Sequence, residues 1–151
     1  RDLHVRSRRQ RQMCIRDRQK EDFKLLDFFT PNETEAEFYL NKKIETKEDI
    51  QNAAKEFLSM GVKNIIITLG AKGVYFENKE ENYFIDALKL KDEVIDTTGA
   101  GDAFNGALAV ALSKDSNYKD AIIFANKVGG ISTTRLGAAS SMPLLKEVEE
   151  Y

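Results

Sequence analysis

The sequence predicts an α/β fold built in layers, and three observations support this prediction. The chain has 151 residues, the length of one domain, and 42% of them are apolar, which is enough for a core. Short β-branched, apolar segments alternate with longer segments of helical periodicity. Glycine and proline residues separate these segments. Together these features favour a sheet covered by helices.

Composition and charge argue against several classes of protein. The formal net charge of −2 gives no overall attraction to nucleic acid, and no apolar run approaches the length of a membrane span. No secretory signal pattern is visible. The single cysteine, Cys14, makes an internal disulfide impossible. We therefore expect a cytoplasmic protein with neither nucleic-acid nor membrane partners.

The N-terminal residues differ in charge from the remainder. Residues 1–20 contain 8 basic and 2 acidic residues, a net charge of +6, whereas the other residues contain 15 basic and 23 acidic residues, a net charge of −8. A basic arm for nucleic acid or lipid and an Arg-rich targeting segment are two alternatives. The segment QMCIRDR is similar to a translated read-adapter sequence. We interpret residues 1–18 as a foreign or disordered head and residues 19–151 as the domain.

The first part of the domain predicts one strand and two helices. The apolar segment Phe23–Phe29 predicts a buried strand that ends before a proline. A helix is expected from Asn32 to about Asn41, with acidic residues in its first turn, as the helix dipole favours. Thr46 caps a second helix, with Asp49 in the capping-box position and an apolar stripe at Ile50–Leu58.

The middle of the chain predicts four strands. Asn64–Leu69 is apolar and β-branched without alternation, which is typical of a central strand covered on both faces. Gly70–Gly73 predicts a tight turn into a strand at Val74–Phe76. Shorter strands are expected at Tyr83–Ile85 and Val94–Ile95.

The last third predicts three helices. They cover Ala103–Leu112, a segment from Tyr118 to about Ile131, and Leu144–Glu150 with Pro143 at its first turn. A polar loop rich in hydroxyls and carbonyls, residues 132–143, joins the last two helices.

The stretch Asp96–Phe104, with the sequence DTTGAGDAF, is the strongest candidate for a functional site. It predicts a strand end, a glycine turn and a helix N-terminus, where unpaired N–H groups and the helix dipole attract anions. Gly99 and Gly101 let an anion approach the backbone, and Asp102 could accept a proton from an attacking hydroxyl. The alternative is an ordinary turn with Asp102 as a cap. The spacing fits neither a Walker A loop nor the dinucleotide fingerprint.

Four motifs together resemble the ribokinase-like (PfkB) sugar kinases. They are PNETEAE at Pro31–Glu37, TLGAKG at Thr68–Gly73, DTTGAGDAFNGALAVAL from Asp96, and TTRLGA within the loop at 132–143. They occur in family order between about Phe23 and Glu150. The resemblance implies the C-terminal part of a ribokinase-like three-layer α/β/α domain, truncated at its N-terminal half and without the small β-sheet lid. Family members draw most sugar contacts from that half, so we expect these residues alone to have little or no kinase activity.

The resemblance implies ATP-dependent transfer of the γ-phosphate to a sugar hydroxyl. PNETEAE together with TTRLGA is most similar to the branch that phosphorylates ribose at its 5-hydroxyl. Fructose and 2-keto-3-deoxygluconate kinases are alternatives, and so is a nucleotide-binding module without catalysis. The implied cofactors are ATP, Mg²⁺ and a monovalent cation, K⁺. The implied partners are a sugar and ATP, and the complete protein is expected to be a homodimer.

The resemblance also assigns residues to three sets. In the catalytic set, Asp102 is the base and the backbone N–H groups of Gly99, Ala100 and Gly101 bind the transferred phosphoryl group. The nucleotide-binding set is Asn32, Thr68, Leu69, Gly70, Ala71, Lys72, Gly73, Gly101 and Asn126. The metal set is Glu35, which acts on Mg²⁺ largely through water, and the K⁺ ligands Asp96, Thr98, Ser132, Arg135, Gly137 and Ser141, of which the last four act mostly through backbone oxygens.

Overall fold

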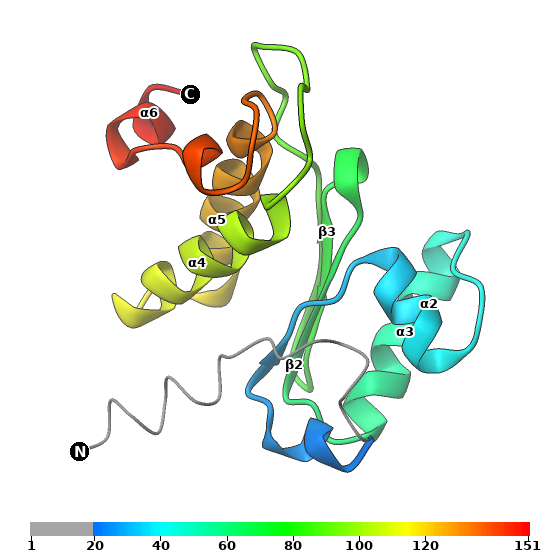
Figure 1. The fold of residues 1–151 in the computed structure, drawn as a ribbon. Coiled ribbons are helices and arrows are strands. Elements are labelled where there is room, and N and C mark those ends of the chain that lie inside the picture. Colours follow the sequence, from blue (N-terminus) through cyan, green and yellow to red (C-terminus); the bar gives the residue numbers. More distant parts are fainter. Residues whose placement is uncertain (1–19) are drawn as a thin grey trace. The chain divides into compact units, whose positions relative to one another are not determined.

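A computed structural model of the protein describes residues 20–151 (Figure 1). The head predicted at residues 1–18 lies outside the described residues. The chain forms two compact units. The first comprises the chain up to Gly70 together with Val74–Phe84, and the second comprises Ala71–Gly73 and Ile85–Tyr151. Within residues 20–151, every helix is too short or too polar to cross a bilayer.

The sheet of the first unit has four strands in the order β1-β2-β3-β4. The strands are β1 (Phe28–Phe29), β2 (Asn64–Thr68), β3 (Val74–Glu77) and β4 (Asn82–Ile85). β1 pairs in parallel with β2, and β2 pairs antiparallel with β3. The residues of β2 before Thr68 and all of β3 are buried. The predicted central strand at Asn64–Leu69 is therefore confirmed, one residue shorter.

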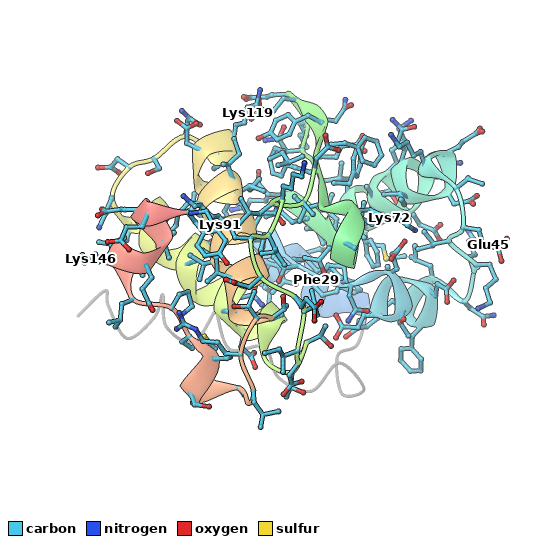
Figure 2. All side chains as sticks on the ribbon, turned by 90° about the horizontal axis from the view of Figure 1, so that it is seen from above. Phe29, Glu45, Lys72, Lys91, Lys119 and Lys146 are labelled. Atoms are coloured by element: carbon cyan, nitrogen blue, oxygen red, sulfur yellow. The ribbon has the colours of Figure 1, made fainter. Side chains whose placement is uncertain are left out.

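Two helices, α2 (Glu33–Leu40) and α3 (Lys47–Ser59), lie beside each other in this unit, and α3 packs against β2 and β3 (Figure 1). A capping box of Thr46 and Asp49 begins α3, as predicted. The buried side of α3 contributes Phe57, whose ring centroid lies 5.1 Å from that of Phe29. Figure 2 shows Phe29 among the packed side chains and Glu45, in the loop between the helices, projecting outward.

The strand predicted at Phe23–Phe29 is wrong over most of its length. A 3₁₀ helix covers Lys20–Leu25, and only Phe28 and Phe29 pair with β2. The N–H of Leu26 donates to the Phe23 carbonyl at 3.1 Å, and both side chains are buried. The i to i+3 spacing places both side chains on one side of a 3₁₀ turn, so a short apolar run without alternation fits this turn as well as a strand.

The second unit is built on two long helices, α4 (Ala100–Ser113) and α5 (Tyr118–Ser132), which pack side by side (Figure 1). A 3₁₀ helix, η4 (Ala139–Ser141), and a short helix, α6 (Leu145–Glu150), follow. A Cβ at Gly129 of α5 would lie 3.2 Å from the Ala100 carbonyl oxygen. The absence of a side chain at Gly129 therefore lets α5 approach the first residue of α4.

The segment that leads into α4 differs from its prediction in two ways. Val94 and Ile95 form no strand and are 58% and 64% exposed. Instead, the N–H groups of Ile95 and Asp96 both donate to the Thr133 carbonyl, at 2.8 and 3.1 Å. Helix α4 also begins at Ala100 rather than Ala103. Among the described residues no strand pairs with Val94–Ile95, and α4 starts early because the chain turns at Gly99 and enters the helix directly.

Candidate active site

The start of α4 forms a backbone turn open to a ligand. Gly99 is the N-cap in the left-handed conformation, with φ 78°, and provides no side-chain cap. The N–H of Ala100 donates to the Thr97 carbonyl at 3.2 Å, and that of Ala103 donates to the Gly99 carbonyl at 2.9 Å. Helix geometry therefore leaves the N–H groups of Gly101 and Asp102, between these two donors, without an intrahelical acceptor.

The surroundings of this turn favour an anion. A Cβ at Gly101 would meet no atom within 4 Å, so the backbone there can be approached closely. The helix dipole adds partial positive charge at the same place. Asp102 lies in the first helical turn with its side chain exposed. The predicted catalytic residues thus share one turn, although the N–H of Ala100 is already used within the turn.

Asp96 joins the two loops of the predicted K⁺ site. One carboxylate oxygen accepts the N–H of Thr98 at 2.9 Å, and the other accepts the N–H of Gly137 at 3.0 Å. Hydrogen bonds from the Thr98 hydroxyl, then from the backbone N–H groups of Thr98 and Gly137, hold the pKa of Asp96 below its usual range. The structure therefore brings Asp96, Thr98 and Gly137 together beside the start of α4.

The side chains of the other residues in the predicted K⁺ site are bonded within the protein. The Ser132 hydroxyl donates to the Gly129 carbonyl at 2.8 Å, and the Ser141 hydroxyl donates to the Ala138 carbonyl at 2.7 Å. The Arg135 guanidinium contacts a carboxylate of α6. Across residues 20–151, no three His, Cys, Asp or Glu side chains gather as a metal cluster. The side-chain oxygens of Ser132 and Ser141 are therefore already used within the protein, and the assignment of a K⁺ site to these loops stays a prediction.

In the first unit, the structure brings Asn32, Glu35 and Thr68 together. The Asn32 and Glu35 side chains each accept the backbone N–H of the other residue, at 2.8 and 2.9 Å, which forms a capping box at the start of α2. Asn32 also forms a parallel bridge with Thr68 at the end of β2. The carboxylate of Glu35 is thus held beside the strand end that leads into the predicted nucleotide-binding turn.

The turn at Thr68–Gly73 is divided between the units. Leu69 is buried, and Gly70–Lys72 forms a 3₁₀ turn in which Ala71 and Lys72 are exposed. Gly73 belongs to the second unit and has φ 96°. A Cβ on Gly73 would lie 2.0 Å from the Ile85 carbonyl oxygen, so only glycine fits there.

Asn126 of α5 lies near the same segment of the second unit. Its side-chain amide donates to the Asp86 carbonyl at 2.9 Å. Gly73 and Asn126, two predicted nucleotide-binding residues, therefore both contact residues 85–87.

Sequence reasoning missed several residues that shape the site. Ala138 lies against Gly99, where a Cβ would be 2.9 Å from that of Ala138. The Thr133 carbonyl anchors the segment before the turn, and Glu147 binds Arg135. A weak signal existed only for Glu147, an acidic residue in the first turn of a helix. The contacts of Ala138 and Thr133 join residues far apart in the sequence, so no local pattern could indicate them.

Comparison with known proteins identifies the family. The pfkB family of carbohydrate kinases matches residues 2–145. The chain is 42% identical over 127 residues to the ribokinase of Staphylococcus aureus and 39% identical over 127 residues to that of Haemophilus influenzae. These matches cover 83% and 84% of this chain but 41% of each relative. The chain therefore spans about two-fifths of the length of the curated relatives it matches.

Solved structures agree with this assignment. The ribokinase of Thermotoga maritima matches 91% of this chain and 46% of its own, with a TM-score of 0.81 and 42% identity. The Arabidopsis thaliana ribokinase complexed with ribose and ATP matches 87% of this chain and 42% of its own, with a TM-score of 0.82 and 32% identity. The predicted ribokinase-like α/β fold is confirmed. Because the family match begins at residue 2, the boundary at residue 18 stays a prediction. From motifs, fold and relatives together, this chain belongs to the pfkB family of carbohydrate kinases.

Proposed function

We propose that this chain is the nucleotide- and phosphoryl-binding part of an ATP-dependent sugar kinase with ribose as its acceptor. The observation that carries the proposal is the start of α4, where a left-handed Gly99 opens the backbone beside an exposed Asp102. Several relatives are named ribokinase, and one solved relative holds ribose and ATP, which supports this acceptor. The activity of the complete protein is part of the proposal, because the chain spans only part of its relatives.

In the proposed reaction, Asp102 accepts the proton of the sugar hydroxyl that attacks the γ-phosphorus of ATP. The N–H groups of Gly101 and Asp102 stabilise the negative charge on the phosphoryl group. The bond from the phosphorus to the sugar oxygen forms while the bond to ADP breaks. Little covalent chemistry falls to the protein in such transfers, so positioning and electrostatics account for most of the catalysis.

The residues present fit the cofactors that the family resemblance implies. Asn32, the turn at Thr68–Gly73 and Asn126 would bind ATP. Glu35 would hold Mg²⁺ through water, because this ion prefers oxygen ligands and retains its waters. Bound Mg²⁺ would neutralise charge on the phosphates. Backbone oxygens of the loop at 132–141, with Asp96 and Thr98, would hold K⁺ next to the anion-binding turn.

The choice of acceptor has a close alternative within the same reaction class. The chain is 34% identical over 125 residues to a deoxyribokinase of Salmonella typhi. Turnover with ribose, 2-deoxyribose, fructose and 2-keto-3-deoxygluconate should therefore be compared, in a chain where this segment is joined to the remainder of a ribokinase. A clear preference for ribose would support the proposal, and a preference for another sugar would replace its acceptor.

The substitution Asp102→Asn tests the proposed base. In the joined chain it should lower kcat by about 10²–10⁴-fold, because a positioned general base typically contributes that much. ATP affinity should change little, since the backbone donors remain. Asp115→Asn, at an exposed aspartate beyond the other end of α4, is the matched control and should leave kcat unchanged. Retained turnover in Asp102→Asn would contradict the assignment.

The same measurements test whether the 151 residues act alone. We propose that their turnover is at least several orders of magnitude below that of the joined chain, because positioning the acceptor is worth roughly 7–11 kcal/mol of barrier. Equal kcat values for the two chains would overturn this part of the proposal.

A further inference from the structure

The second unit contains an ion pair that the proposed chemistry does not use. Arg135, just after α5, contacts Glu147 of α6 through both terminal guanidinium nitrogens, Nη1 and Nη2. Its Nη2 lies 2.6 Å from Oε1 and its Nη1 lies 3.3 Å from Oε2. The Glu147 carboxylate also accepts the N–H of Leu144 at 2.6 Å. The paired contact of two guanidinium nitrogens with two carboxylate oxygens fixes both the distance and the relative orientation of Arg135 and Glu147.

The loop that this pair closes makes one contact with the turn at Gly99–Asp102 and another with Asp96, three residues before that turn. It runs from Arg135 to Leu144, and both ends are held by the same carboxylate. Between them, the N–H of Gly137 donates to Asp96 at 3.0 Å, and Ala138 lies against Gly99. The pair therefore restricts the part of the chain that meets the start of α4.

The C-terminal residues hold the other side of this region. The Lys91 ammonium donates to the Glu150 carbonyl at 2.9 Å and lies 4.6 Å from the centre of the Tyr151 ring. The Tyr151 hydroxyl donates to the Asp92 carboxylate at 2.6 Å. Figure 2 labels Lys91 and, on α6, Lys146. Helix α6 and the residue after it thus connect the segment before Asp96 with the loop that carries Gly137.

We propose that Arg135 and Glu147 are positioning residues for phosphoryl transfer, holding the loop at 136–143 against the turn at Gly99–Asp102. This inference rests on the proposed function. It differs from the predicted role of Arg135 as a cation ligand through its backbone, because it assigns a role to the side chain. The guanidinium is occupied by Glu147, so it acts on the site through the loop.

The geometry separates this pair from an ordinary surface ion pair. Exposed pairs contribute about 0–1 kcal/mol to stability. The side chains of Arg135 and Glu147 are 38% and 37% exposed, whereas those of Lys146 and Glu150, on the same helix, are 85% and 66% exposed with charged atoms 3.9 Å apart. Hydrogen bonds from Arg135, then from the Leu144 N–H, hold the pKa of Glu147 below its usual range. We therefore expect the Arg135–Glu147 pair to stabilise mainly the loop at 136–143.

Native-state hydrogen exchange of the 151-residue chain tests this role without requiring activity. Glu147→Gln keeps an acceptor for the Leu144 N–H but removes the charge, and Arg135→Lys keeps the charge but removes the paired contact. Each should accelerate exchange at the Gly137 and Thr98 amides by about two- to fivefold, because local openings of the loop become more frequent when the pair is weakened. Amides inside α5 should not change. Lys146→Gln is the matched control and should leave all these rates unchanged.

Two results would overturn the inference. One is unchanged exchange at Gly137 in both variants, and the other is equal acceleration in α5, which would mean general destabilisation. The double variant should be no worse than either single variant, because both remove the same interaction. If the double variant accelerated exchange by the product of the two single effects, the two side chains would act independently, which would also contradict the inference.

ATP binding separates this inference from the proposed function. Calorimetry should show weaker Mg²⁺-ATP binding in Glu147→Gln than in the unmodified chain and no change in Lys146→Gln. If the unmodified chain binds no ATP, the proposed function fails, while the exchange rates still decide the role of the pair. If the unmodified chain and Glu147→Gln bind ATP equally, the inference fails and the proposed function stands.

Discussion

Gly99 and Gly101 are two residues apart, yet they have different roles. Gly99 has φ 78°, and a Cβ there would lie 3.0 Å from the Cα of Ala138. Gly99→Ala should therefore lower the free energy of unfolding by about 1–3 kcal/mol, since a left-handed non-glycine residue is strained. Urea unfolding of the chain checks this. An unchanged midpoint would contradict the described turn.

Gly101→Ala is the matched comparison. The position lies inside α4 and is open to solvent, so alanine should raise the free energy of unfolding by about 0.5–1 kcal/mol. The added methyl group nevertheless occupies the approach of an anion. ATP affinity should fall about tenfold or more, since hydrogen bonds to charged groups contribute about 1.5–3 kcal/mol. A more stable protein with weaker ATP binding would distinguish function from folding.

At the residue scale, local patterns predicted the backbone geometry of the candidate motifs. Gly99 lies at the predicted glycine turn, and Asn32 begins the predicted helix with Glu35 as its capping partner. Contacts between distant residues could not be predicted. The pairing of Asp96 with Gly137 spans 41 residues, and nothing in either local pattern specifies it.

At the scale of single elements, the start of helix α3 is capped by the charged side chain of Asp49. The stability of this cap should depend on pH. Hydrogen bonds from the Thr46 hydroxyl, then from the N–H groups of Thr46 and Glu45, hold the pKa of Asp49 below its ordinary value of 3.8. The folded state therefore favours the charged form. The stabilisation is complete above pH 3.8 and is lost as the pH falls through the folded pKa.

The variant Asp49→Asn isolates this contribution. Its free energy of unfolding should be lower than that of the unmodified protein at pH 6, and the difference should shrink as the pH is lowered stepwise from 3.8. Urea unfolding across this pH series measures the difference. A constant difference would show that the charge of Asp49 does not stabilise the cap.

The packing of α5 on α4 gives a second prediction at this scale. Gly129→Ala would place a methyl group 3.2 Å from the Ala100 carbonyl oxygen, which cannot move without moving the start of α4. It should destabilise the protein by about 1 kcal/mol, the lower end of the range for overpacking. Gly130→Ala, one residue on, meets only ordinary contacts at 3.6 Å and should be neutral or stabilising. Equal thermal midpoints for the two variants would contradict this packing.

Helices with caps were easier to predict than strands. The starts of α2 and α3 follow from Asn32 and Thr46, whose side chains specify a helix locally. The β-branched pair Val94–Ile95 predicted a strand, but a strand requires a neighbour, and among the described residues none pairs with it. A local pattern can indicate extended backbone without indicating whether another strand lies beside it.

At the scale of the whole molecule, the predicted site residues are shared between two units. Asn32, Glu35 and Thr68 belong to the first, and Asp96, Asp102 and Asn126 belong to the second. Motif order along the chain predicted the family and the α/β fold. It could not predict that the division would cross the turn at Thr68–Gly73, because that depends on which residues pack together.

Calorimetric titration with Mg²⁺-ATP is the measurement that decides whether this chain binds ATP at the start of α4. The unmodified chain and Gly101→Ala would be titrated in K⁺ and in Na⁺, after confirming that both are folded. We expect saturable binding that is stronger in K⁺ and weakened by Gly101→Ala. A folded chain that binds no ATP in either salt would contradict the proposed function.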